Sequence, residues 1–146
     1  NPSGYENTID YVTIATQSNA VDFGDLLTTR SYHGGASNNI RGVFAAGNAP
    51  GPGAVNNVIQ YITIATTGDA VDFGDLFLVT YSGGALASQT RGLFVGGADH
   101  PAGTYQNILQ FVTISTTGNA QDFGDMSTSR GSYDGNTSDC HGGLGQ

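Results

Sequence analysis

The chain has 146 residues, enough for one globular domain with a buried core, and no apolar run approaches the roughly 20 residues needed to span a bilayer as a helix. It has 23 Gly, no Lys, no Trp and a single Glu, so good helix formers are scarce and an all-β fold of short strands and tight turns is predicted. The net charge of −8 argues against nucleic acid as a partner and against anionic membranes, because polyphosphate binding depends on many Lys and Arg.

One unit of 50 residues recurs along the whole chain. A single domain over 1–146 is therefore predicted, with repeats at about 7–56, 57–106 and 107–146. The motif Asp-Phe-Gly-Asp and its upstream strand return in all three copies, and Arg-Gly-x-Phe returns in two. The matching segments are Val21–Asp25, Val71–Asp75 and Gln121–Asp125; Asn7–Thr16, Asn57–Thr66 and Asn107–Thr116; and Arg41–Phe44 and Arg91–Phe94.

Four strands are predicted in each unit, here in the second copy. Val58–Ile64 alternates apolar and polar residues, and the turn at 66–69 sends the chain back through Ala70–Leu76 as a hairpin partner. Tyr81–Ala87 is a strand of small residues, and Arg91–Val95 is a fourth strand that ends at a Gly pair. Four short antiparallel strands in 50 residues are typical of a β-propeller blade.

The arrangement resembles the kelch repeat family, which has a Gly pair after one strand and an aromatic residue on each of two later strands. The Gly pair is Gly96-Gly97, Phe stands at the second aromatic position where kelch units carry Trp, and the positions are Tyr11, Tyr61 and Phe111, then Phe23, Phe73 and Phe123. The wording of the repeats is also similar to tandem repeats of marine bacteriophage and environmental proteins. These resemblances imply a propeller of four-stranded blades and an extracellular or virion-associated location.

The phase of the repeat predicts incomplete blades at both ends. Numbered outward from the axis, strands 3 and 4 lie at Asn7–Leu26, two whole blades at Ser31–Met126, and strands 1 and 2 at Gly131–Gly145. Three blade equivalents leave too wide an angle to close a ring. We expect a head-to-tail homodimer that completes six blades, the alternative being that the chain is part of a longer propeller.

The repeated Asp-Phe-Gly does not indicate a kinase, because the chain has no Lys to hold phosphates. We expect the Phe residues to pack between blades, and Arg41 and Arg91 to be structural, pairing with aspartates such as Asp25 or Asp75, with anion binding as the alternative. The structural repeat residues are Phe23, Phe73, Phe123, Asp25, Asp75, Asp125, Arg41 and Arg91.

No metal site or cofactor is predicted. Asp69, Asp72 and Asp75 are expected to cap turns, with Ca²⁺ ligation as the less favoured interpretation. The histidines lack ligand spacing, and Cys140 beside His141 would point to opposite faces of a strand.

The segments that differ between copies are the predicted binding loops, since scaffold positions repeat while loops are free to change. Their exposed polar and aromatic groups are Tyr5, Asn48, His100 and Tyr105. The sequence favours a non-catalytic binding or attachment module that recognises a glycan or a protein receptor at a phage or cell surface. The alternative is a structural protein that forms rings on a larger particle, and an enzyme is less favoured.

Overall fold

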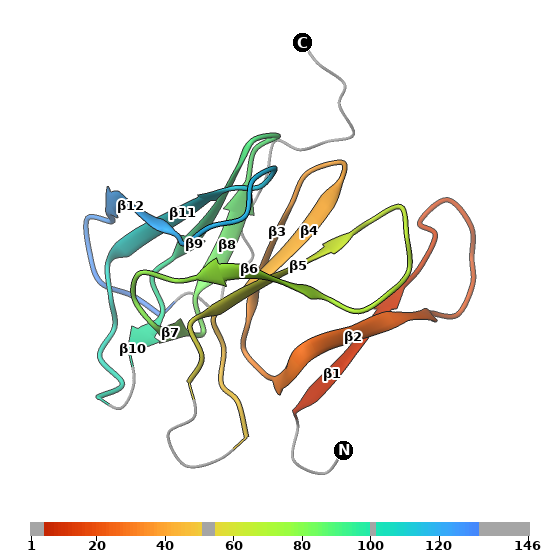
Figure 1. The fold of residues 1–146 in the computed structure, drawn as a ribbon. Coiled ribbons are helices and arrows are strands. Elements are labelled where there is room, and N and C mark those ends of the chain that lie inside the picture. The colour runs from red at the N-terminus through yellow and green to blue at the C-terminus, as the bar shows by residue number, and fades with distance from the viewer. Residues whose placement is uncertain (1–4, 51–54, 100–101, 132–146) are drawn as a thin grey trace.

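The structure, a computed structural model, describes residues 5–50, 55–99 and 102–131, and these contain strands and turns but no helix (Figure 1). The predicted all-β class is confirmed. In this described part there is accordingly no helix long and apolar enough to cross a bilayer. The strands are β1 (Glu6–Tyr11), β2 (Val21–Arg30), β3 (Gly34–Ser37), β4 (Arg41–Ala45), β5 (Val58–Thr63), β6 (Val71–Asp75), β7 (Thr80–Tyr81), β8 (Gly84–Ala87), β9 (Arg91–Val95), β10 (Ala98–Asp99), β11 (Ile108–Thr113) and β12 (Gln121–Asp125).

Two four-stranded antiparallel sheets repeat the same topology. One has the order β3-β4-β5-β6 and the other β8-β9-β11-β12, and equivalent residues pair in both, with Val43 opposite Tyr61 and Leu93 opposite Phe111. β1 and β2 form a two-stranded sheet that corresponds to the last two strands of each larger sheet. A register shift follows Ile59 in β5 and recurs at the equivalent points of β1 and β11, so the repeat extends to irregularities of the backbone.

The predicted strand Tyr81–Ala87 is wrong in its extent, because the chain divides it into β7 and β8. Ser82 has a φ of +56°, and β7 pairs with β10 and not with β9. A Cβ on Gly83 would lie 3.1 Å from the carbonyl oxygens of Val95 and Gly96, so the backbones approach closely at this bend. A strand cannot continue straight through such a bend.

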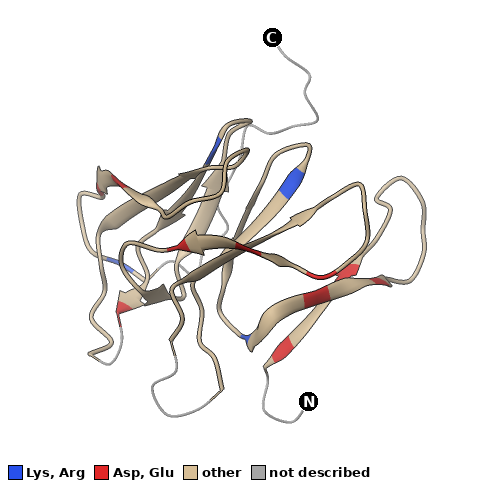
Figure 2. Cartoon of the chain, in the orientation of Figure 1, with Lys and Arg blue, Asp and Glu red and all other residues tan. Residues whose placement is uncertain are grey.

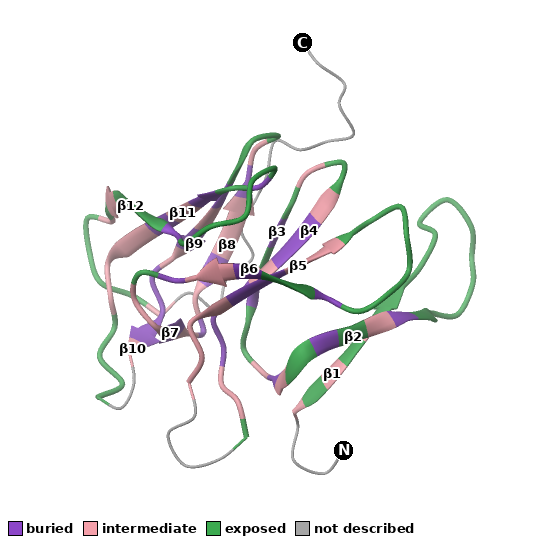
Figure 3. Cartoon of the chain, viewed as in Figure 1, coloured by how far each residue is buried: buried purple, intermediate pink, exposed green. Residues whose placement is uncertain are grey.

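The two larger sheets pack together through small residues of β3, β8 and β9. A Cβ built on Gly92 in β9 would lie 3.0 Å from the Cβ of Ala36 in β3, and one on Gly34 would lie 3.2 Å from that of Ala85. The buried interior lies between the sheets (Figure 3). Its cluster consists of Ala36, Val43, Ala45, Ala46, Ile59, Phe73, Leu76, Ala87, Phe94, Val112, Ile114 and Ala120.

A main-chain contact joins each sheet to the next at the Asp-Phe-Gly-Asp strand. The Gly68 N–H donates to the Phe23 carbonyl at 2.7 Å, and the Ala70 N–H donates to the Asp25 carbonyl at 2.8 Å. Fifty residues later, the Gly118 and Ala120 N–H groups donate to the Phe73 and Asp75 carbonyls at the same distances. These contacts require glycine, since a Cβ on Gly74, whose φ is +143°, would lie 2.5 Å from the backbone of Gly118.

Two buried glutamines reinforce this contact. Gln60 accepts the Leu27 N–H at 2.7 Å, and Gln110 accepts the Leu78 N–H at 2.7 Å while donating to the Leu78 carbonyl at 2.9 Å. Both side chains are buried, so each supplies hydrogen bonds that water cannot reach. The strand alternation marks these positions only as polar, and their burial comes from the neighbouring sheet.

Candidate functional site

The same shallow pocket occurs in the second and third copies, inside the hairpin turns β5–β6 and β11–β12. Its volume is about 330 Å³ in the second copy and 290 Å³ in the third. Equivalent residues line both pockets: Tyr61, Ile62, Thr63, Thr66, Thr67, Gly68, Asp69 and Val71 in one, and Phe111, Val112, Thr113, Thr116, Thr117, Gly118, Asn119 and Gln121 in the other. The site is therefore a property of the repeat.

A hydrogen-bonded turn shapes the floor of each pocket. The Thr66 N–H donates to the Thr63 carbonyl at 3.1 Å, and the Thr116 N–H donates to the Thr113 carbonyl at the same distance. The four hydroxyl-bearing side chains at 66, 67, 116 and 117 are exposed. Each hydroxyl can donate one hydrogen bond and accept two, so the turn offers both kinds of partner to a polar ligand.

A hydrogen bond from the preceding copy fixes the side chain at the rim of each pocket, which is a carboxylate in Asp69 and an amide in Asn119. Oδ1 of Asp69 accepts the Asp25 N–H at 3.0 Å, and Oδ1 of Asn119 accepts the Asp75 N–H at 3.1 Å. The second oxygen of Asp69 and the amide NH₂ of Asn119 have no hydrogen-bond partner among the described residues. One pocket thus presents a fixed acceptor and the other a fixed donor.

An aromatic ring forms one wall of each pocket. Tyr61 packs edge to face on Phe73 with 5.8 Å between ring centroids, and Phe111 packs in the same way on Phe123. The guanidinium carbon of Arg41 lies 4.5 Å from the centroid of Tyr61, and that of Arg91 lies 4.9 Å from the centroid of Phe111. These stacked layers fix the orientation of the wall.

The contacts of the repeated arginines differ from the expected pairing with Asp25 or Asp75. Arg41 lies opposite Thr63 in the ladder, so Tyr61, two residues along the same strand, shares its face of the sheet. The ring is therefore the nearer partner. Arg41 also donates from Nη1 to the Ile114 carbonyl at 3.0 Å, which joins two sheets.

The repeated phenylalanines are buried in two of the three copies. Phe23 and Phe73 are buried, whereas Phe123 is about half exposed because no further sheet covers it among the described residues. The repeated aspartates Asp25 and Asp75 act through their main-chain N–H and carbonyl groups. In the third copy, the carboxylate of Asp122 accepts the Gly124 N–H at 2.9 Å.

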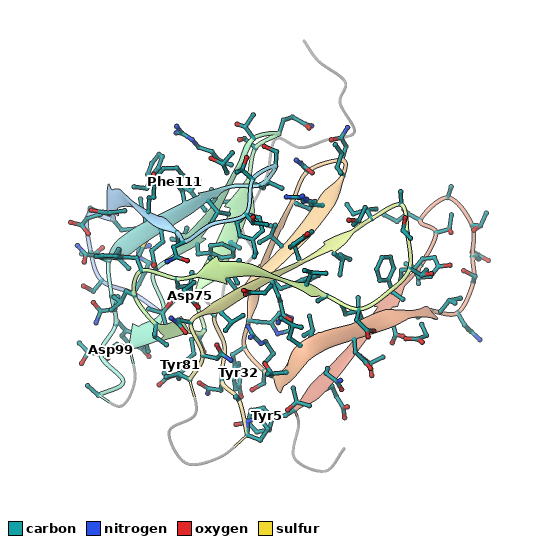
Figure 4. All side chains as sticks on the ribbon, in the orientation of Figure 1. Tyr5, Tyr32, Asp75, Tyr81, Asp99 and Phe111 are labelled. Atoms are coloured by element: carbon teal, nitrogen blue, oxygen red, sulfur yellow. The ribbon has the colours of Figure 1, made fainter. Side chains whose placement is uncertain are left out.

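The predicted binding loops lie away from the pockets. Figure 4 places Tyr5 along one edge of the molecule with Tyr32, Tyr81 and Asp99, far from Phe111. Asn48 bridges Ser31 and Val55 through its backbone, and Tyr105 is exposed and bridges Ala98. His100 lies outside the described residues, as do Cys140 and His141. Glu6 lies opposite Arg30 and Ser31 bridges Asn48, so Tyr5 and Asn48 flank the same end of β2.

Sequence reasoning missed the threonines of the pockets. The signal was present, because Thr-Thr-Gly followed by Asp or Asn recurs at 66–69 and 116–119. The recurrence was explained by turn formation alone. That these hydroxyls also border a concavity with an aromatic wall becomes visible only when the strand and the turn are placed together.

Two ionisable groups with shifted pKa values lie between the β1–β2 sheet and the β3-β4-β5-β6 sheet, outside both pockets. Arg30 is buried and donates to the Ala46 and Val58 carbonyls at 3.1 and 3.2 Å, and burial lowers the pKa of its guanidinium. Partial burial, and then the charge of Arg30, lower the pKa of His33. Within the described ranges no group of three His, Cys, Asp or Glu side chains is placed to hold a metal ion.

Comparison with known proteins gives no assignment. No protein-family model matches the chain, and no curated protein sequence is significantly similar to it.

Proposed function

We propose that the chain is a non-catalytic binding module that recognises neutral glycans through the recurrent pockets, at a cell or virion surface. The observation that carries the proposal is the repetition of one pocket at equivalent residues, with the same ring wall and the same pair of threonines. Weak sites repeated on one scaffold gain avidity when a ligand also repeats. A polysaccharide is such a ligand.

The chemistry of the pockets fits a sugar. A pyranose has an apolar C–H face that packs on an aromatic ring, and hydroxyls that pair with the hydroxyl, carboxylate and amide groups of the turn. Acidic side chains are spread over strands β1, β2, β6, β10 and β12 (Figure 2), and the chain carries a net charge of −8. This charge disfavours sulfated or sialylated ligands and selects neutral ones.

The architecture that we propose for this module is a kelch-like β-propeller. Each four-stranded antiparallel sheet corresponds to one blade, and β1–β2 corresponds to the two outer strands of another. The close packing of β3 against β8 supports a radial arrangement with the first strands innermost. In such a ring the hairpin turns repeat at one radius, so the pockets face solvent at regular intervals.

The proposal is tested by applying the full chain to an array of neutral and acidic oligosaccharides, followed by calorimetric titration of the best neutral binder. We expect selective binding of neutral sugars with two equivalents per chain, matching the two pockets. Silence on the array with an intact fold would overturn glycan binding and favour a purely structural role.

Matched threonine variants assign the binding to the pockets. Thr67→Val and Thr117→Val each remove one exposed hydroxyl and keep the shape of the side chain, and together they are expected to weaken binding by about tenfold. Thr104→Val changes an exposed threonine outside the pockets and serves as the control. Equal affinity of the double variant and the control would exclude these hydroxyls from the site.

A further inference from the structure

The contact between neighbouring repeats is made twice within the chain by equivalent atoms. It joins the turn before one Asp-Phe-Gly-Asp strand to that strand of the preceding copy, through two main-chain hydrogen bonds and one side-chain hydrogen bond. A fourth hydrogen bond, from Arg41 Nη1 to the Ile114 carbonyl, joins residues 73 positions apart. Each of these hydrogen bonds has its donor in one sheet and its acceptor in the neighbouring sheet, so equivalent donors and acceptors can be identified in the other repeats.

The last described repeat presents one side of this contact without a partner. Phe123 is 48 % exposed, whereas Phe73 is 3 % exposed, and no atom lies within 4 Å of a Cβ built on Gly124. In the described part of the chain, the Phe123 carbonyl and the Asp125 main chain have no counterpart of the bonds made by the earlier copies. Among the described residues, the guanidinium of Arg91 also has no carbonyl partner equivalent to that of Arg41.

The first repeat presents the opposite side, which no described residue of the chain covers at Ile14. Ile14 is 98 % exposed, whereas its equivalent Ile114 is fully buried, and Val12 is exposed where Val112 is buried. A groove of about 500 Å³ runs beside β1, lined among others by Tyr11, Val12, Phe44 and Ile62. In the larger sheets, an additional strand pairs with the equivalent of β1, namely β4 with β5 and β9 with β11.

We infer that a second copy of this chain docks head to tail, with its β1–β2 turn against β12 of the first. The hydrogen bonds of this interface follow when those between the last two sheets are moved along the sequence by one repeat of 50 residues. The Ser18 and Ala20 N–H groups of one copy donate to the Phe123 and Asp125 carbonyls of the other, and Oδ1 of Asn19 accepts the Asp125 N–H. Arg91 then donates to the Ile14 carbonyl.

A second copy fits these faces because the chain already contains both halves of the contact. The interface continues the one between successive sheets, including the open approach at Gly124, where the earlier glycines meet a turn. Burial of Ile14 and the half-exposed Phe123 supplies the apolar area that drives association. The association does not depend on sugar binding, so it can hold or fail independently of the proposed function.

One residue departs from the pattern. Ser18 stands where the other copies have Gly68 and Gly118, whose φ values are +151° and +154°, and Ser18 is not among the residues with positive φ. Nothing lies within 4 Å of a Cβ built on either glycine, so a serine side chain fits sterically. Docking requires only that the backbone of this turn change, so that Ser18 adopts a positive φ. This conformation is disfavoured for a residue other than glycine and costs free energy.

Solution mass of the full chain tests the association, by light scattering and sedimentation at micromolar concentration. We expect a species of about 30 kDa or a higher multiple of the 15.0 kDa chain. Ile14→Glu is expected to weaken association at least tenfold, whereas Phe77→Glu, at another exposed apolar residue, leaves it unchanged. A 15.0 kDa monomer for the unmodified chain would overturn the inference.

Cross-linking tests the head-to-tail geometry. In a Cys140→Ser background, Asn19→Cys and Asp125→Cys are prepared as separate proteins, mixed, and treated with a short bis-maleimide. We expect a covalent dimer from the mixture, and none from either protein alone. Efficient linkage of one variant to itself would indicate a face-to-face dimer and contradict the inference, as would a mixture that reacts no better than its components.

Discussion

Strands β1 and β11 occupy equivalent positions in the repeat, but their surroundings in the molecule differ. The segment that follows β11 is covered by the second sheet, so Ile114 is fully buried, while Ile14 at the same position of the repeat is 98 % exposed. The Ile114 N–H donates to the Thr90 carbonyl, and its carbonyl accepts from Arg41. The residue type is the same, and the neighbouring strand decides its burial.

This difference shows which surfaces of a copy pack against neighbouring copies, and at which ends of the described chain these surfaces have no neighbour. Each copy specifies a surface for the copy before it and another for the copy after it, so the first and last copies each retain one open surface among the described residues. Apolar side chains remain exposed there because the repeat keeps its core residues even where no neighbour covers them. The contrast between equivalent positions can be tested by matched substitutions.

The largest contrast is expected between two glycines. Gly74→Ala places a Cβ 2.5 Å from the backbone of Gly118 and also requires a φ of +143°. We expect a loss of about 4 kcal/mol in the free energy of unfolding, from overpacking and backbone strain together.

Gly124→Ala carries only the backbone strain, since its side chain meets no atom within 4 Å. We expect a loss of about 1–2 kcal/mol for the monomer. Urea denaturation of both variants measures the contrast, and equal losses would show that the packing between repeats contributes little.

A buried and an exposed isoleucine give the second contrast. Ile114→Ala removes a fully buried side chain from the core cluster, and we expect a loss of about 3 kcal/mol. Ile14→Ala should change the unfolding free energy of the monomer by less than about 0.5 kcal/mol. Thermal and urea unfolding at a concentration where the chain is monomeric compare the two, and a similar cost at both positions would mean that Ile14 is covered within one chain.

The third contrast concerns the turn of the first copy. Ser18→Gly restores the residue of the other two copies and removes the strain of adopting a positive φ on docking. We expect association to become about tenfold tighter, corresponding to about 1.4 kcal/mol, with little change in monomer stability. Sedimentation equilibrium measures the dissociation constant, and weaker association would show that the turn does not adopt the backbone of Gly68.

The smallest expected effect is a pH dependence at His33, between the first two sheets. Because partial burial and Arg30 lower its pKa, the unfolded chain binds the proton more readily than the folded one. His33 should therefore not change the free energy of unfolding above about pH 6.5, and this free energy should fall as the pH drops below that value.

His33→Gln should flatten this part of the profile, with His100 and His141 unchanged in both proteins. Urea unfolding between pH 8 and 5.5 compares the two. Parallel profiles would show that His33 has an ordinary pKa. The effect is small because part of the imidazole remains exposed to solvent.

Much of the fold followed from local sequence patterns. Alternation in Val58–Ile64 and the turn residues after it predicted the β5–β6 hairpin, and the structure confirms strands at Val58–Thr63 and Val71–Asp75. The division of Tyr81–Ala87 was missed because it depends on the close approach of Gly83 to the carbonyls of Val95 and Gly96. That approach joins segments distant in sequence, and no local propensity reports it.

The candidate site was less accessible to prediction. Variable loops directed attention to Tyr5, Asn48, His100 and Tyr105, while the pockets are built from repeated residues. Asp69 becomes a rim residue only because Asp25 of the preceding copy fixes its position, and Arg41 meets Tyr61 only because of the strand register. Both are tertiary contacts between segments distant in sequence. The repeat pattern therefore shows which residues recur but not that they line a pocket.

The joint between sheets at Gly24 and Gly68, and again at Gly74 and Gly118, is formed mainly by backbone atoms, with one side-chain oxygen from Asp69 or Asn119. A joint of this kind requires of its side chains only glycine and one acceptor oxygen, so the ligand-facing positions beside it can change within that limit. The copies already differ there, with Tyr61 and Asp69 in one pocket and Phe111 and Asn119 in the other. A scaffold with this property can acquire new specificities one pocket at a time while the assembly of its sheets stays the same.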